Sequence, residues 1–289
     1  MRPGNVFAMS GALPFTSKAA NCTCVSFAMD CAASQPGVNL LKTPSRPAFL
    51  PAKDRGIYGV WIALVWTGML GGFVPDLRNF LSEAPPPPVV LHAHAIVSTL
   101  WLAAITAQIA LVEVRNVALH RRLGWWIVGL SVALIPLGLV ASLVDMARGA
   151  GQTPYTPEFL GHEFQQLAVF AILLVLATLL RRDPAAHKRL MILLPVSILD
   201  PGTGRLWTHF LSWRPHGPFG SWLHAYWGNM AMVAAMLLRD RWRHGRAHPA
   251  LWFGAALITV GEVVAIWLDF CPAWHNAAAR LVAAWGWTG

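Results

Sequence analysis

Histidines recur along the chain at a nearly constant spacing, and their side chains suit both metal binding and proton transfer. Three pairs share a spacing of 24 to 26 positions: His94 with His120, His162 with His187, and His224 with His248. Imidazole is a ligand of haem iron, copper and zinc, and it titrates near neutral pH. On helices that cross a membrane, the first members of these pairs would form an outer tier and the second members an inner tier.

Two tiers of histidine would suit a haem b protein, because transmembrane cytochromes b hold haem between histidines of neighbouring helices. However, about 25 residues of helix span about 37 Å, which is more than the hydrocarbon thickness of a bilayer. Both tiers are then expected at the water interface. For the inner set, contact with lipid phosphate is favoured and haem is the alternative; this set is His120, Arg121, Arg122, His187, Arg189 and His248.

The outer tier offers a second chemistry. His94, His162 and His224 could hold a copper or zinc ion, with Glu163 as the fourth ligand. A protonation relay through the same side chains is the competing interpretation. His92 lies two positions before His94, so on a continuous helix their rings would point about 200° apart.

Two acids are expected in the middle of the membrane. Asp200 follows His187 by 13 positions, and Glu262 follows Pro249 by 13. At 1.5 Å per residue both would lie roughly 20 Å from the inner face. An ionised group there costs about 2.5 kcal/mol or more, so neither side chain should face lipid.

Asp200 is followed by Pro201 and Gly202, which should break the helix at that point. Arg205 lies one turn further on and could pair with Asp200, which would make the pair a packing feature. Alternatively, the break marks a binding site, as broken helices do in transporters. The predicted pocket comprises His92, His94, His162, Glu163, Asp200, Arg205, His224 and Glu262, with Gln166, Asn229 and Asp269 nearby.

These residues must be positioned by a polytopic bundle of membrane helices. The chain is 56% hydrophobic and 12% charged, against about 25% charged in soluble domains. Seven spans are expected, and three repeated hairpins could follow the first of them; the predicted spans are 56–75, 90–113, 122–144, 160–180, 187–208, 220–238 and 249–269. Residues 1–54 are expected to form a poorly ordered cytoplasmic tail, 55–270 the membrane domain, and 271–289 an outer interfacial segment.

Charge sets the expected orientation. With the N-terminus inside and the C-terminus outside, 17 Lys and Arg fall on the inner side and 5 on the outer side. The net charge of +9 lies in short turns, which indicates membrane orientation rather than nucleic-acid binding. The expected partner is the phospholipid bilayer, with further membrane subunits or a second copy of the chain left open.

The motifs as a set resemble a family of bacterial inner-membrane proteins without assigned chemistry. The matching stretches are His92-x-His94, Gln108, His120 to Gly124, His187 to Met191, and His248-Pro249. The His187-Lys-Arg-Leu-Met turn is also similar to membrane assembly proteins of haem–copper oxidases. The resemblance implies a multi-pass protein of the bacterial inner membrane.

Three functions remain open. The first is a pocket that binds or passes a small molecule, metal ion or proton. The second is a redox or oxidase-assembly protein handling haem, copper or quinone, and the third is a membrane scaffold subunit. The sequence has no nucleophile elbow, phosphate-binding glycine loop or zincin motif, so it leaves open whether the protein is an enzyme.

Overall fold

Every regular element in the described part of the chain is a helix. The computed structural model describes residues 54, 56–149, 156–211 and 216–286, which belong to one compact unit, Phe49–Gly289. The expectation of an all-helical fold is confirmed for these residues. The predicted tail lies outside them, apart from Asp54.

The helices follow one another with short connections. Their bounds are α1 Ile57–Leu81, α2 Val89–Glu113, α3 Val117–Arg148, α4 Leu160–Leu179, α5 Pro184–Ser197, α6 Asp200–Phe210, α7 Gly217–His244, α8 Pro249–Leu268 and α9 Pro272–Ala284. Short 3-10 turns, Pro157–Phe159 and Leu180–Arg182, flank α4.

Five segments are long and apolar enough to cross a membrane. They are Ile57–Leu81, Val89–Glu113, Val117–Arg148, Pro157–Arg182 and Pro249–Leu268. The helices of the fifth and sixth predicted spans, α5, α6 and α7, do not meet this description. The break between Ser197 and Asp200 divides one predicted span into two short helices, and α7, although long, has Asn229, Arg239 and Asp240 along it.

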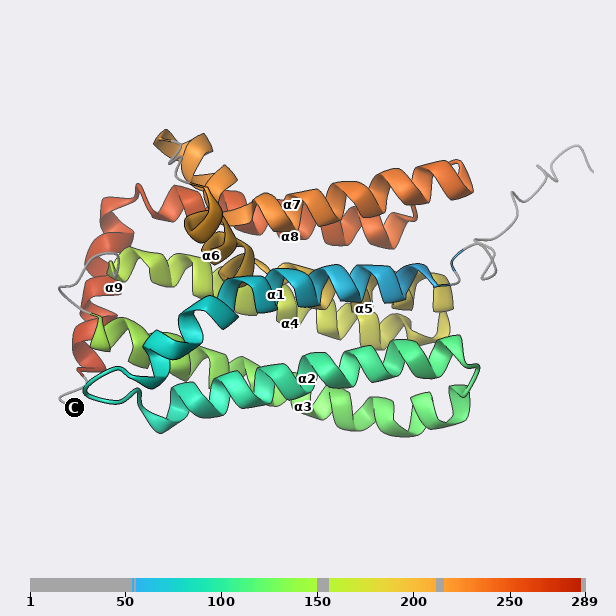
Figure 1. Cartoon of the computed structure of the whole chain (residues 1–289). Coiled ribbons are helices and arrows are strands. Elements are labelled where there is room, and N and C mark those ends of the chain that lie inside the picture. The colour runs from blue at the N-terminus through green and yellow to red at the C-terminus, as the bar shows by residue number, and fades with distance from the viewer. Residues whose placement is uncertain (1–53, 55, 150–155, 212–215, 287–289) are drawn as a thin grey trace, which may run out of the picture. The chain divides into compact units, whose positions relative to one another are not determined.

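The long helices run side by side and form one core. In Figure 1, α2 pairs with α3 and α7 pairs with α8, while α4 and α5 lie between these pairs. Among the core residues are Leu102, Phe170, Leu193 and Ile258. The helix α9 runs across one end of the bundle, where it packs against α3 and the turn before α4 (Figure 1).

The opposite end of the bundle carries the basic turns, and we call it the basic end. Side chains cap the helices that begin there. Asn116 accepts a hydrogen bond from the Leu119 amide, and Asp183 accepts bonds from the amides of Ala185 and Ala186. The His248 ring accepts one from the Ala250 amide. These caps satisfy amides that a helix start leaves without partners.

The predicted helix break at Asp200 is present, and it sets the position of α6. This short helix packs closely against α1. Glycines allow the contact, because a Cβ atom on Gly72 would lie 2.0 Å from the Gly202 carbonyl oxygen. The start of α6, with Asp200, is thereby held within the bundle.

Candidate functional site

Two carboxyl groups lie buried where α6 and α8 enter the core. Asp200 is 6% exposed and Glu262 is 1% exposed. The Gln166 Nε2 atom donates to Asp200 Oδ2 over 2.8 Å, and the Asn229 Nδ2 atom donates to Glu262 Oε1 over 3.3 Å. Asn229 also interacts with Asp200. We call Asp200 and Glu262 the buried acid pair.

Each acid keeps one oxygen without a partner. Asp200 Oδ1, Glu262 Oε2 and Asn229 Oδ1 are buried without a hydrogen-bond partner of good geometry, and within the described part of the chain the Trp222 side chain is the one further donor that interacts with Glu262. Among the described residues, no ion pair joins either acid to a lysine or arginine. Most buried polar groups in proteins are satisfied, so such a group of bare acceptors indicates a place for protons, water or a ligand.

A hydrogen-bonded triad leads from this region to a cavity. His162 Nε2 lies 2.8 Å from Asp269 Oδ2, and the Tyr226 hydroxyl lies 2.6 Å from His162 Nδ1. In the neutral imidazole, Nε2–H donates to the carboxylate and the tyrosine hydroxyl donates to Nδ1. In the imidazolium both nitrogens donate. A change between the neutral and the protonated ring would move a proton between His162 and its two partners.

The cavity beside the triad has a volume of about 230 Å³. It is lined by Phe159, His162, Ser221, His224, Ala225, Ile266 and Asp269. The Phe159 ring stacks on the His162 ring at 4.7 Å between centroids, and His224 meets Trp207 edge-on. Tyr226 is fully buried behind His162 and interacts electrostatically with Asp200 and Glu262. Tyr226 is therefore the member of the triad that interacts with the buried acid pair, through electrostatics and without a direct hydrogen bond among the described residues.

Sequence reasoning named most of these side chains but missed Tyr226. The structure brings Asp200, Glu262, His162 and His224 into one region, together with Gln166, Asn229 and Asp269. Tyr226 falls one turn before Met230 on a helix that reads as ordinary apolar sequence. The only signal in the sequence was its position, two residues after His224 and four before Met230.

The predicted Asp200–Arg205 pair is wrong. Arg205 is 43% exposed at its side chain and pairs with Asp76 of α1 over 3.3 Å, with its guanidinium over the Phe73 ring. On a helix that begins at Asp200, Arg205 projects away from the first turn and toward α1. The carboxyl group of Asp200 is left to the amide of Gln166.

Three other residues of the predicted pocket make contacts elsewhere in the bundle. Glu163 accepts a hydrogen bond from the Ser142 hydroxyl over 3.1 Å. His92 packs edge-on against Phe80. His94 faces Gly138 of α3, and its Nδ1 atom is buried without a partner.

The predicted metal trio of His94, His162 and His224 does not converge. His162 and His224 line the same cavity, but His94 faces α3. Both nitrogens of His162 are also occupied by Tyr226 and Asp269. The equal spacing in sequence failed here because it fixes depth along a helix and not the face on which a side chain lies.

At the basic end, the structure reveals an ion-pair network that the sequence did not predict. Its members are Asp54, Lys188, Arg189, Arg239, Asp240 and His244, and we call it the basic-end network. Arg189 is 1% exposed and binds Asp240 through two nitrogens, at 2.7 and 2.8 Å. The expected contact of Arg189 with lipid phosphate is therefore wrong.

Asp54 lies at the centre of this network. Burial by itself would raise the pKa of its carboxyl group, but hydrogen bonds from Lys188, Arg239 and His244 hold the pKa well below its usual range. Asp54 is the last residue of the expected tail, 1–54, which has no helical period. A single acid directly before the first apolar run was the available signal.

The remaining inner-set residues divide by exposure. Arg121 and Arg122 are exposed, as contact with lipid headgroups would require, whereas His248 is half-buried and caps α8. His120 and His187 face one another across α3 and α5. The interpretation of this set as one lipid-contacting belt is therefore too simple.

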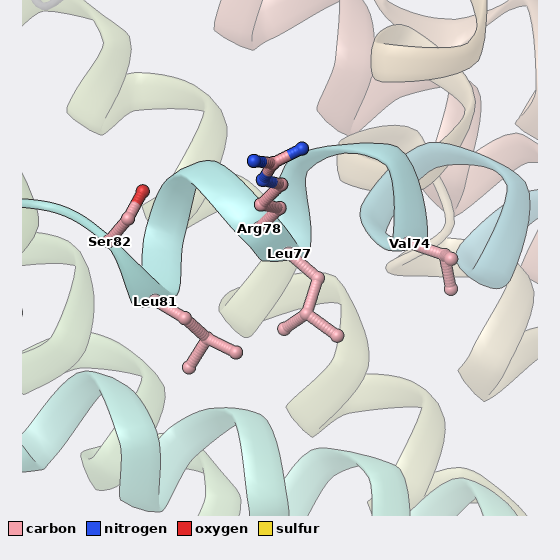
Figure 2. Close-up of a pocket in the computed structure, with 5 residues that line it drawn as sticks. All are labelled: Val74, Leu77, Arg78, Leu81 and Ser82. Carbon is pink, nitrogen blue, oxygen red and sulfur yellow. The ribbon is translucent and has the colours of Figure 1, made fainter.

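A shallow groove lies along the last turns of α1. It has a volume of about 530 Å³, and there Leu77 and Leu81 point to the opposite side from Arg78 (Figure 2). Val74, Leu77 and Leu81 are exposed apolar side chains of a helix apolar enough to span a membrane. A lipid chain would cover such a groove.

Comparisons with known proteins add no family to this description. No protein-family model, curated protein or solved structure matches the chain.

Proposed function

We propose that the protein crosses the membrane seven times, with α5 and α6 forming one interrupted crossing. The 28 residues of α7 are about 42 Å long at 1.5 Å per residue, and α5 and α6 supply 14 and 11 helical residues on the two sides of the break. All three pack along helices that are apolar enough to span a bilayer. Their polar side chains face the interior, where Asn229, Asp240 and Asp200 are buried. In the positive-inside orientation the basic end faces the cytoplasm of a bacterial inner membrane.

We further propose that the protein binds and exchanges a proton at the buried acid pair. The observation that carries this proposal is the set of bare acceptor oxygens on Asp200, Glu262 and Asn229. Two carboxylates without a cationic partner are costly in a dry interior, so the pair is expected to retain a proton. A single proton shared by the two carboxyl groups would turn one of their unpaired acceptor oxygens into a hydrogen-bond donor.

The triad supplies the route for that proton. Asp269 lies at the cavity, and His162 and Tyr226 follow it toward the buried acid pair. A histidine that bonds a carboxylate on one side and a hydroxyl on the other is suited to pass a proton between them. The cavity lies at the end of α8 remote from the basic turns, so exchange is expected with the outer side.

Infrared spectroscopy of the purified protein tests this proposal. The wild type should show a protonated carboxyl stretch that shifts on exchange into D₂O. Glu262→Gln or Asp200→Asn should remove it, and Glu83→Gln, at an exposed loop carboxylate, should not. Tyr226→Phe should retain the band but slow its exchange, by roughly 100-fold if the hydroxyl acts as a positioned acid and base. A band insensitive to both acid substitutions would overturn the proposal and leave a scaffold.

A further inference from the structure

Two histidines from different helices meet near the basic end. His120 lies in the first turn of α3, and His187 lies in the first turn of α5. Their ring centroids are 6.4 Å apart, and the ring planes are nearly perpendicular at 80°. Since a metal–nitrogen bond is about 2.0–2.1 Å long, two imidazoles on opposite sides of one ion have centroids about 6 Å apart.

Backbone carbonyl groups fix the tautomer of both rings. His187 Nδ1 lies 2.8 Å from the Ala177 oxygen, which can only accept, so Nδ1 carries the proton and Nε2 keeps a lone pair. His120 bonds the backbone of Gln108, and its Nδ1 atom is buried without a partner. Its Nε2–H is thus the donor, and Nδ1 keeps a lone pair. A ring held by a carbonyl group on one nitrogen, with the other nitrogen open, is the usual state of a metal-binding histidine.

The residues that hold these rings contribute further bare polar atoms. Gln108 is 7% exposed, and neither its Oε1 nor its Nε2 atom has a hydrogen-bond partner. Thr178, next to Ala177, has a buried hydroxyl that is also unpartnered. A buried amide that pairs with nothing costs free energy, and a bound ion with its water would satisfy it.

We propose that His120 Nδ1 and His187 Nε2 bind one copper ion. The donors are neutral imidazoles, which suit first-row transition metals and exclude the hard ions Mg²⁺ and Ca²⁺. Among the divalent ions of that series copper binds nitrogen ligands most tightly, and two opposed imidazoles also satisfy the low coordination number of Cu(I). Arg121 adjoins the site, so a cation of low charge, Cu(I), is favoured over a divalent one.

The other group of ligand atoms at this end is unsuited to a metal. Asp54, Asp240 and His244 present three atoms within 4.8 Å of one another. However, Lys188, Arg189 and Arg239 already bind these carboxylates. A metal ion there would have to displace cations, whereas His120 and His187 offer lone pairs that no donor uses.

Copper binding to the full-length protein, purified with a tag that contains no histidine, tests the site. Under reducing conditions, Cu(I) is titrated in competition with a chromogenic Cu(I) chelator. The wild type should bind one equivalent. His120→Ala and His187→Ala should each weaken binding by more than tenfold, since even loss of an outer partner of a metal ligand costs about 10–100-fold. His92→Ala removes a half-buried histidine elsewhere and should bind as the wild type does.

A second measurement does not depend on how the variants fold. Wild-type protein loaded with Cu(II) should give an electron paramagnetic resonance spectrum with coupling to two nitrogen nuclei. Absence of nitrogen coupling, or unchanged Cu(I) affinity in both alanine variants, overturns the proposal. A Soret band in the purified protein would also overturn it, because the histidine pair would then hold haem iron.

Discussion

Asp54 and Asp240 lie among lysine, arginine and histidine side chains, whereas Asp200 and Glu262 lie among amides and a tyrosine hydroxyl. Both pairs of acids are buried, and both lie between helices distant in sequence. In the basic-end network the charges are compensated, so the carboxylates can stay ionised and join α5, α7 and Asp54, which precedes α1. At the buried acid pair the compensation is missing, and a mobile proton is the simplest way to supply it. Burial of acids alone therefore does not set the two regions apart, and the missing counter-charge is the difference on which the proposed proton site depends.

Removing a member of the basic-end network should have the largest effect. Arg189→Met leaves Asp240 buried without its two-pronged partner. Breaking such a pair costs about 3–5 kcal/mol, so we expect a loss of this size in the free energy of unfolding, measured by denaturant titration in detergent. The double variant Arg189→Met with Asp240→Leu should recover part of the loss. No recovery would show that Arg189 acts mainly through Asp54 or through packing.

The glycine contact that seats α6 should have the next largest effect. A methyl group at Gly72 would lie 2.0 Å from the Gly202 carbonyl oxygen, so Gly72→Ala must push α6 away from α1. Overpacking of this kind costs about 1–3 kcal/mol, and the infrared band of the buried acid pair should shift with it. Gly59→Ala on the same helix meets no atom within 4 Å and is the matched control. Equal behaviour of the two variants would refute the close contact.

Acid should weaken the basic-end network before it affects the buried acid pair. The pKa of Asp54 is held below its usual range, so its contribution to stability is fully present above the ordinary aspartate pKa of about 3.9. That contribution is lost as the pH falls through the lowered value. Stability measured against pH should thus decline at the acid end, and Asp54→Asn should flatten this decline. Glu83→Gln is the control and should leave the decline in place.

Neutralising the buried acid pair should have the smallest effect on stability. Glu262→Gln keeps the shape of the side chain, so we expect the free energy of unfolding to change by no more than about 1 kcal/mol. The same kind of change in the network, Asp240→Asn, should cost more because it removes a charge-assisted pair. Thermal unfolding of the two variants side by side provides the measurement. A larger loss for Glu262→Gln would mean that its carboxylate is ionised and structurally paired.

The sequence predicted the helices well where the pattern of apolar residues was continuous. The second and seventh predicted spans agree closely with α2 and α8, and the break at Asp200 was also predicted. The third predicted span, 122–144, is shorter than α3, which continues through Arg121 at one end and to Arg148 at the other. The first was ended at Pro75, which α1 accommodates within the helix. The apolar composition predicted where each helix crosses the membrane. It did not predict the residue at which a helix with a polar end begins or stops.

For the candidate site, the sequence predicted how far along its helix each residue lies, but not the side of the helix on which its side chain projects. Asp200, Glu262 and His162 were chosen because an ionisable group inside an apolar segment must avoid lipid. The partners of Arg205 and the separation of His94 from His162 depend on how helices rotate and pack, which a single sequence does not encode locally. The basic-end network was missed for a similar reason, since its members come from three distant segments.

The break after Ser197 has a mechanical consequence. Asp200 stands on a short helix joined to α5 by two residues, while Gln166 and Glu262 stand on uninterrupted helices. At its far end α6 is tethered to α1 through Asp76, which meets Arg205 at 3.3 Å and His209 at 3.2 Å. A pivot of α6 would change the separation of the two carboxyls, but it would also have to open the close contact between Gly72 and Gly202. The seating of α6 on α1 therefore sets the distance between Asp200 and Glu262.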